Sequence, residues 1–196
     1  MATRAYHHGN LREELLDRAE ATLAERGLEA LSLRELARDV GVSHAAPRRH
    51  FADRQELLDA LARRGFEHLG VALHAATAIQ GDFPERFAAV ASAYITFATD
   101  HAALLELMFA GKHRAGAEAV LAASDAAFAE LFALVAEGQD QGEIEAGDID
   151  RVGVPLFASL HGLAALLNGG MVDPSTRDAL VAEVAARALR GVAPRS

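Results

Sequence analysis

Apolar residues recur at intervals of three and four along most of the chain, which is the spacing of one face of an α-helix. In the first such segment, Leu11, Leu15 and Leu16 fall on one side of the predicted helix. Polar capping residues and glycines mark where the segments begin and end. The pattern predicts four helices in the N-terminal part of the chain, at residues 10–26, 32–40, 44–51 and 53–78.

The starts of these helices carry capping residues. A short polar residue followed three positions later by glutamate can satisfy two backbone amides that the first helical turn leaves free. A three-residue turn with a glycine between the second and third helices is typical of a helix-turn-helix. These features are Asn10 with Glu13, Ser32 with Glu35, Asp53 with Glu56, Ser43 as the cap of the third helix, Gly27 and Gly41 as stops, and Gly41-Val42-Ser43 as the turn.

The rest of the chain has a helical pattern too, and it is less polar. Helices are predicted near residues 84–99, 100–110, 115–139, 148–167 and 174–191. The helix that begins at residue 53 continues from the first part into the second without a linker. We therefore predict an all-α protein in which a three-helix head, residues 1–52, is joined by a long helix to a helical body, with residues 53–196 as the second domain.

Composition favours helices and excludes several kinds of chemistry. Of 196 residues, 44 are alanine, the best helix former. The absence of cysteine excludes thiol catalysis, iron–sulfur clusters and disulfides. The sequence has no phosphate-binding loop, nucleophile elbow, paired-histidine metal motif or dinucleotide fingerprint, so we expect no catalytic residue, metal or cofactor. No cationic leader precedes an apolar stretch, which predicts a cytoplasmic protein.

The net charge of −9 is distributed unevenly. Residues 1–65 hold 11 arginines and 11 acidic residues, so the rest of the chain carries the whole negative balance. Within the neutral head, residues 44–54 hold three arginines and two histidines against one acid, Asp53. A local basic patch on an acidic protein is the pattern expected at a nucleic-acid contact.

Residues 152–172 form a run of 21 without a formal charge, long enough to span a bilayer. The run also contains Pro155, His161 and four glycines, and it lacks an aromatic belt. We therefore expect a buried helix or a subunit interface, and no membrane partner. Small residues such as Gly162 and Ala165 would let a second helix approach closely.

Several short motifs between residues 10 and 58 have a specific order and spacing. They are Leu31-Ser32-Leu33-Arg34-Glu35-Leu36-Ala37, Gly41-Val42-Ser43, His50-Phe51-Ala52-Asp53-Arg54 and Leu57-Leu58. This arrangement resembles the DNA-binding domain of the TetR family of bacterial transcriptional regulators. The opening Tyr6-His7-His8-Gly9-Asn10-Leu11 is similar to one branch of that family. Leu160-His161-Gly162 resembles the Trp-His-Gly signature of one of its C-terminal ligand domains, with Leu160 in place of tryptophan.

The resemblance implies a head that binds a double-stranded DNA operator, with the third helix in the major groove. His44, Ala45 and Ala46 lead that helix, where an imidazole can reach a base edge and methyl groups can touch thymine methyls. Hydroxyls, guanidinium groups and helix N-termini would hold the phosphates. The candidates for phosphate contact are Ser32, Arg34, Ser43, Arg48, Arg49, His50 and Arg54.

Two positions depart from the family pattern. Arg48 stands where the family usually has tyrosine, and its guanidinium can still bind phosphate. Pro47 falls at the fourth position of the predicted third helix, where its missing N–H removes a hydrogen bond to the Ser43 carbonyl. We expect both departures to leave DNA binding intact.

For the body, the resemblance implies a homodimer, since two half-sites need two heads. It also implies a pocket for an unknown small-molecule effector, with repression as the family habit. The last two helices are expected to form the dimer interface through Leu156, Leu160, Gly162, Leu163, Leu167, Leu180, Val184 and Leu189. An apolar or aromatic effector could be lined by bulky residues that could equally be ordinary core: Phe87, Tyr94, Phe97, Met108, Phe109, Phe128, Phe132, Phe157 and His161.

A function of another class stays open at this point. An all-helical protein that binds small molecules or other proteins, without sequence-specific DNA binding, would have the same composition. The basic patch at residues 44–54 distinguishes the two, because a carrier protein would not need it.

Overall fold

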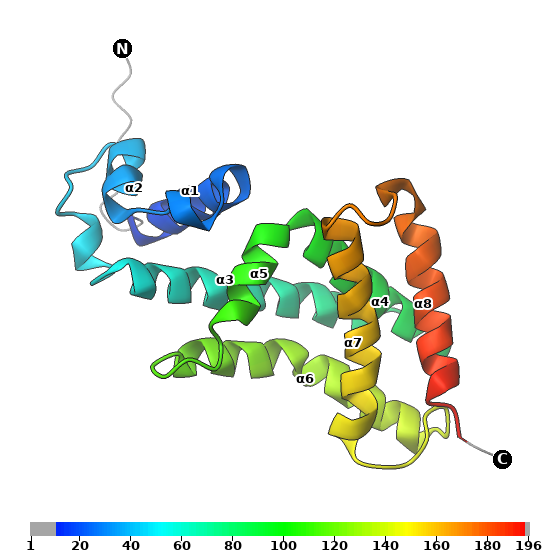
Figure 1. Cartoon of the computed structure of the whole chain (residues 1–196). Helices are drawn as coiled ribbons and strands as arrows, with labels where there is room; N and C mark the ends of the chain where they lie inside the picture. Colours follow the sequence, from blue (N-terminus) through cyan, green and yellow to red (C-terminus); the bar gives the residue numbers. More distant parts are fainter. Residues whose placement is uncertain (1–10, 195–196) are drawn as a thin grey trace. The chain divides into compact units, whose positions relative to one another are not determined.

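The computed structural model describes residues 11–194, which form helices joined by turns (Figure 1). The predicted all-α fold is confirmed. Within this range eight of the nine predicted helices are present near their expected bounds. The predicted cap Asn10 and the Tyr6–Asn10 motif lie outside the described residues. The helices are α1 (Leu11–Arg26), α2 (Leu33–Val40), α3 (Arg54–Thr77), α4 (Phe83–Asp100), α5 (Ala102–Ala110), α6 (Glu118–Asp140), α7 (Ile149–Asn168) and α8 (Arg177–Gly191), with 3₁₀ turns η1 (Leu28–Ala30), η2 (Pro47–Arg49) and η3 (Pro174–Thr176).

The chain packs into two compact units. Unit 1 holds the chain up to Gly65 together with Ala103–Leu121, and unit 2 holds Phe66–Ala102 and the chain from Ala122 onward. The boundary set by packing therefore lies inside α3, and a segment from the middle of the chain belongs to the first unit. The division at residues 52–53 stays a prediction about where the DNA-contacting part ends.

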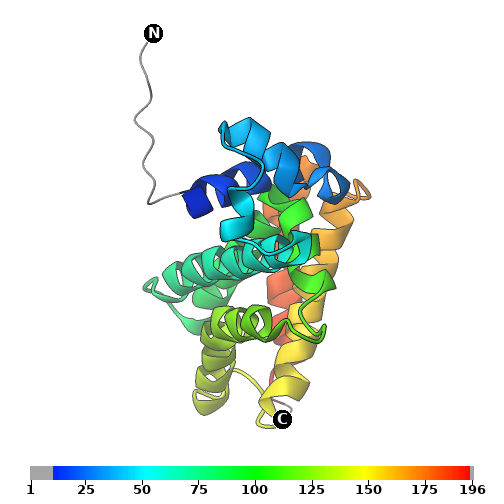
Figure 2. The same ribbon diagram turned by 90° about the vertical axis from the view of Figure 1, so that its left-hand side faces the viewer.

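In unit 1, α1 and α2 pack against each other (Figure 2). Their apolar faces bury Leu15, Leu16 and Leu36, together with Phe51 and Leu57. Gly41 ends α2 in the left-handed conformation, with φ of 81°, where its amide donates to the carbonyls of the last turn. The predicted stop at Gly41 is confirmed, since this conformation favours a residue without a Cβ.

The predicted third helix at residues 44–51 is wrong. The segment is a turn followed by η2, and most of its hydrogen bonds span three residues: the Ala46 amide donates to the Ser43 carbonyl at 2.9 Å, and the His50 amide donates to the Pro47 carbonyl at 2.9 Å. One bond, from the Phe51 amide to the Pro47 carbonyl at 2.9 Å, spans four residues. Pro47 has no N–H to donate to Ser43, so the α-helical ladder cannot start there. Ser43 therefore caps no helix.

Two of the predicted caps, in which a short polar residue is followed three positions later by glutamate, can be compared with the structure. One of these capping boxes forms in part and the other does not form. Asp53 accepts a hydrogen bond from the Glu56 amide at 2.9 Å, while the Glu56 carboxylate accepts one from the Ala52 amide. The predicted bond from the Glu56 amide to the Asp53 side chain is confirmed. The bond to the Glu56 carboxylate comes from the amide of Ala52, one residue before the expected donor Asp53. The predicted box at Ser32 is wrong, because its side chain makes no capping hydrogen bond although it occupies the N-cap position of α2.

The helix α5 belongs to unit 1 because it packs closely against Gly65 of α3. A Cβ at Gly65 would lie 2.6 Å from the Met108 Sδ and 3.2 Å from the Leu104 Cγ. The loop that follows is held too, since Arg114 donates to the Asp59 carboxylate at 2.6 Å. A glycine in the middle of α3 thus lets another helix approach.

In unit 2, α4, α7 and α8 pack against one another (Figure 1). The Arg86 guanidinium of α4 donates through both Nη atoms to the Glu137 carboxylate of α6. By length and composition alone, α6 and α7 are long and apolar enough to cross a membrane. Core helices of soluble proteins pass the same test, and α7 places four leucines in the core of unit 2. Packing therefore accounts for these four leucines.

We expect Gly138→Ala to lower the free energy of unfolding by about 1–2 kcal/mol. The new Cβ would lie 2.5 Å from the Phe83 Cζ and 2.9 Å from the Ile144 Cδ1, both in buried side chains. Overpacking costs about 1–3 kcal/mol, and two buried neighbours under 3.0 Å place this site in the upper part of the range, about 2–3 kcal/mol. Subtracting the gain of about 1 kcal/mol from replacing a helical glycine leaves about 1–2 kcal/mol. Urea unfolding at a fixed protein concentration measures the change. Gly191→Ala, whose Cβ meets nothing within 4 Å, is the control and should show no loss.

Candidate nucleic-acid interface

The predicted DNA contacts all lie in unit 1, around the turn that replaces the third helix. Ser32 and Arg34 are at the start of α2, and Arg54 is the first residue of α3. The others lie in or beside η2 and the turn before it. The buried side chains of Pro47 and Phe51 support this segment from inside. Ser43, His44, Ala45, Arg48 and Arg49 are exposed, as is Arg34.

Two open hollows contain most of these residues. One, of about 610 Å³, is lined by Ser32, Arg34, Arg38 and His44 together with Glu29, Ala30 and Glu35. The other, of about 510 Å³, is lined by Ser43, Ala46, Arg49 and His50 together with Leu11, Gly41 and Val42. The structure thus divides seven of the ten predicted contacts between two concave surfaces, one that includes the start of α2 and one that includes the end of η2. Ala45, Arg48 and Arg54 line neither hollow.

The arginines of the head differ in whether their charge is already neutralised. Asp39 forms ion pairs with Arg18, Arg26 and Arg38, and the hydrogen bond from Arg18 lowers the pKa of this carboxyl below its ordinary value. Arg64 pairs with Asp17 and Glu20. Among the described residues, by contrast, Arg34, Arg48 and Arg49 have no ion pair or hydrogen bond within the chain. Their three charges are available to an external anion.

The residues predicted to read bases lie in the turn at 43–46. His44 and Ala45 are exposed, and Ala46 is half-buried beside Pro47. A turn with small side chains can enter a major groove as a helix end can, because the groove is wide enough for a helix. Without the third helix, the residues predicted to contact base edges lie on a turn instead of a helix. His44 and Ala45 are still exposed there.

Arg54 has partners that the sequence did not indicate. Its Nε donates to the Leu31 carbonyl at 3.0 Å, and its Nη2 donates to the Leu28 carbonyl at 2.7 Å. Both acceptors belong to the segment that leads from η1 into α2. The guanidinium thus joins the start of α3 to the start of α2.

One residue near this surface was missed by the sequence analysis. The Arg12 guanidinium of α1 lies over the Phe51 ring, 5.3 Å from its centroid. A cation over an aromatic face is attracted by the negative charge of the ring. In a chain with 18 arginines, no spacing signal separates this one from the others.

The predicted effector-binding residues do not all fall in one unit. Met108 and Phe109 lie in unit 1, and the other seven lie in unit 2. In unit 2, Tyr94, Phe157, His161 and Phe128 form an aromatic cluster: Phe157 contacts the Tyr94 ring edge-to-face at 5.3 Å, the His161 ring in a stacked arrangement at 5.5 Å, and the Phe128 ring edge-to-face at 5.1 Å. Phe87 and Phe97 are buried, and Phe132 packs against Gly153.

A hydrogen bond of 2.7 Å joins the Tyr94 Oη to the His161 Nδ1 within this cluster. Burial raises the pKa of Tyr94 and lowers the pKa of His161. At neutral pH the tyrosine is therefore protonated and donates, and the neutral imidazole accepts. Protonation of His161 would remove the acceptor.

We expect the folded protein to lose stability as the pH falls from 7 to 5, partly through His161. A histidine with a lower pKa in the folded state contributes stability that is present above its unfolded pKa of about 6.5 and lost below it. Melting temperatures across this pH range measure the effect. His161→Asn should flatten the dependence, whereas His113→Asn, which removes an exposed histidine, should not. Equal slopes for all three proteins would contradict the assignment.

The predicted dimer residues separate into two groups. Leu156, Leu160, Leu163 and Leu167 are 2–7% exposed and form part of the core of unit 2. Gly162 is exposed, and Leu180, Val184 and Leu189 of α8 are half-buried. The four leucines of α7 are therefore already covered by their own chain. They can support the residues of an interface from behind, but they are not exposed to a second copy.

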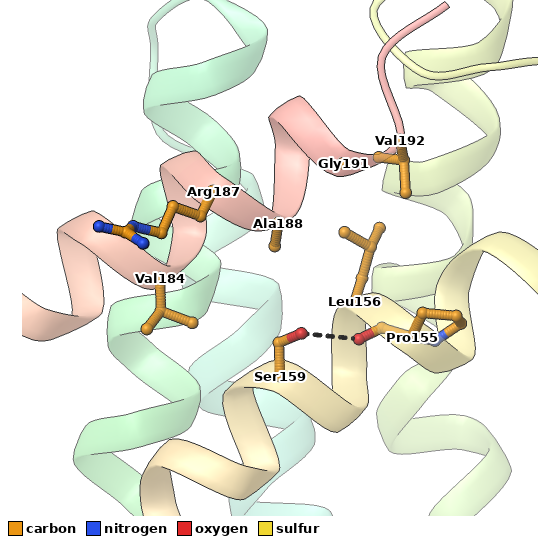
Figure 3. A pocket seen from close by; sticks show the side chains of 8 residues that line it. All are labelled: Pro155, Leu156, Ser159, Val184, Arg187, Ala188, Gly191 and Val192. Carbon is orange, nitrogen blue, oxygen red and sulfur yellow. Dashed lines mark hydrogen bonds between the residues drawn. The ribbon is translucent and has the colours of Figure 1, made fainter.

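The exposed side of α7 is apolar and small. Val154 is 57% exposed and Leu166 is 40% exposed. A groove of about 460 Å³ lies between α7 and α8 (Figure 3). Its lining consists of Pro155, Leu156 and Ser159 from α7, Val184, Arg187, Ala188 and Gly191 from α8, and Val192, which follows α8. Ser159 donates to the Pro155 carbonyl at 3.0 Å, so its hydroxyl is satisfied inside the helix.

Comparisons with known proteins agree with this arrangement. Residues 15–61 match the model of "Bacterial regulatory proteins, tetR family", and residues 87–191, more than half of the chain, match that of "Tetracyclin repressor-like, C-terminal domain". A protein of unknown function from Rhodococcus sp. RHA1 is 46% identical, with a TM-score of 0.89 over 98% of this chain and 100% of the other. The TetR family transcriptional regulator PfmR from Thermus thermophilus shares the fold, at 22% identity and a TM-score of 0.71 over 90% of this chain and 97% of the other.

A curated relative matches a short stretch of the chain. The HTH-type transcriptional repressor KstR2 from Mycobacterium tuberculosis is 42% identical over 52 residues, which are 26% of this chain and 26% of the relative. The two family models cover the head and the body separately, and the order of the motifs agrees with both. The chain belongs to the TetR family and is a DNA-binding transcriptional regulator, not an enzyme.

Proposed function

We propose that this protein is a cytoplasmic repressor that binds a palindromic operator as a homodimer and is released by a small apolar or aromatic effector. The observation that carries the proposal is the exposed turn at 43–46 with three nearby arginines, Arg34, Arg48 and Arg49, that have no partner among residues 11–194. The likeness of a 52-residue stretch of the chain to a named repressor supports repression.

On this proposal the contacts divide into two kinds. Ser32, Arg34, Ser43, Arg48, Arg49 and His50 hold phosphates, which fixes the orientation of the head and carries no sequence information. His44, Ala45 and Ala46 face base edges. Six arginine contacts in a dimer would give a salt slope of about −5 in the logarithm of the binding constant.

Selection of bound duplexes from a library of genomic fragments tests the operator. The expected result is a recovered sequence with two inverted half-sites, whose centres lie about one helical turn or a multiple of it apart. A footprint on both halves should accompany it. Recovery of no enriched sequence, or of a site without twofold symmetry, would contradict a palindromic operator.

The dimer proposal rests on the exposed side of α7 and on α8. Beyond Arg151 in its first turn, this side holds small and apolar residues, including Val154, Gly162, Ala165 and Leu166. Small residues allow close helix packing, and a symmetric interface would bury the same surface of each copy. Light scattering at micromolar concentration should give the mass of a dimer, and a monomer would contradict the proposal.

The effector proposal rests on the aromatic cluster of unit 2. Aromatic rings with few charges favour an apolar or aromatic ligand. A ligand that binds the DNA-free conformation better by about 1–3 kcal/mol would lower operator affinity several-fold to a hundredfold. A thermal-shift screen of such compounds, followed by operator-binding assays, tests this coupling. Compounds that stabilise the protein and leave operator affinity unchanged would contradict it.

A further inference from the structure

We infer that Arg54 is a positioning residue for DNA recognition, which holds the start of α2 against the start of α3 and does not bind phosphate. The inference rests on the proposed function of the turn at 43–46 and the start of α2. It replaces the phosphate contact that the sequence predicted for Arg54.

The contacts of the guanidinium carry the inference. Its Nε and Nη2 donate to two different backbone carbonyls, those of Leu31 and Leu28, which are 23 and 26 residues earlier in the chain. The Leu28 carbonyl also accepts from the Leu31 amide at 3.2 Å, closing η1. A carbonyl oxygen has two lone pairs, so the Leu28 carbonyl can accept both bonds. A planar donor with two N–H groups in fixed directions suits two neighbouring carbonyls.

The position of these carbonyls gives the contact its consequence. Leu31 is buried and immediately precedes Ser32 and Arg34, two of the proposed phosphate contacts. Arg54 itself follows the segment that holds the other contacts, and Asp53 and Glu56 fix the backbone beside it. The guanidinium therefore sets the distance between the two parts of the DNA surface.

Arg54 differs from Arg48 and Arg49 in its contacts, and this difference assigns the arginines of one surface to two roles, phosphate binding and positioning. Arg48 and Arg49 have no partner among the described residues, so their charges are available to phosphate. Arg54 uses two of its nitrogens inside the protein. Loss of a phosphate contact weakens all duplexes alike, whereas loss of a positioning contact affects most the duplex that needs the exact spacing.

The test compares Arg54→Ala and Arg54→Lys with the unmodified protein on the selected operator and on a random duplex, at several salt concentrations. We expect both variants to bind the operator about tenfold or more weakly, to bind the random duplex with unchanged affinity, and to keep the salt slope on random DNA. Lysine should fail to restore operator binding, because an ammonium group cannot reproduce the two fixed directions of a guanidinium. Arg54→Lys keeps the charge, so it remains informative if Arg54→Ala folds poorly.

The opposite pattern would overturn the inference. Equal weakening of both duplexes, a salt slope reduced by about 2 per dimer, and rescue by lysine would identify a phosphate contact. Affinity unchanged on both duplexes would overturn it too. Arg48→Ala and Arg48→Lys serve as the phosphate reference. If Arg48→Ala has no effect on either duplex, the proposed DNA surface itself fails; if Arg48 and Arg54 behave alike as phosphate contacts, only the positioning role fails.

Discussion

Replacement of both Arg48 and Arg49 by alanine is expected to lower the affinity for operator and random duplexes alike, by about three orders of magnitude. Neither side chain has an intramolecular partner among the described residues, so the change removes charge without breaking a contact within the fold. A dimer loses four phosphate contacts, at about 1 kcal/mol or more each. The salt slope should decrease by about 4.

Titrations of fluorescent duplexes at several salt concentrations measure both quantities. The control is Arg26→Ala, which removes the same charge from the same head. The Arg26 guanidinium lies 3.7 Å from the Asp39 carboxylate and donates to the Thr22 hydroxyl at 3.4 Å, so its charge is already compensated. We expect it to change affinity little. If the double variant binds random DNA as the unmodified protein does, these two arginines do not contact phosphate.

The second large effect is expected from Gly162→Glu, which should convert the dimer to monomers at micromolar concentration. A Cβ at Gly162 meets nothing within 4 Å, and the residue is exposed, so the isolated chain should accept the side chain. An unpaired carboxylate buried between two copies costs about 3–5 kcal/mol. The dissociation constant of the dimer should rise by two to three orders of magnitude or more.

Light scattering and analytical ultracentrifugation measure the mass, and circular dichroism confirms that the helices remain. Ala126→Glu is the matched control, since it adds the same charge at an exposed position of α6, outside the proposed interface. Operator affinity should fall with the dimer, because the second head is then no longer held near its half-site. A dimer that persists in Gly162→Glu would remove Gly162 from the interface.

The head could be predicted from the sequence wherever local chemistry decides the conformation. Gly41 ends α2 because only glycine enters the left-handed region easily, and Asp53 caps α3 with its own side chain. The sequence shows that Pro47 has no N–H, although the apolar spacing alone predicts a helix at 44–51. The missing N–H prevents the first α-helical bond, and the burial of Pro47 and Phe51, which spacing does not give, supports the turn and η2 that form instead.

The body shows the same limit. Periodicity correctly put Leu156, Leu160, Leu163 and Leu167 on one face of α7, and it could not tell whether that face meets the same chain or a second copy. The structure buries the face within unit 2. It also places Met108 in unit 1, against Gly65, because a glycine in α3 admits a second helix there. Spacing along one helix gives its faces; which surface each face meets depends on the packing of the others.

The sequence by itself determined the all-α fold, the order of the helices and the membership of the family. Membership of the family also decided against the alternative of an all-helical binding protein without DNA contact. It identified the arginines of residues 44–54 as a group. Only the tertiary structure separated Arg48 and Arg49, which have no partner among the described residues, from Arg54, which donates to Leu28 and Leu31. The physical reason is that a guanidinium is neutralised or engaged by groups more than twenty residues away, and their positions are set by the fold.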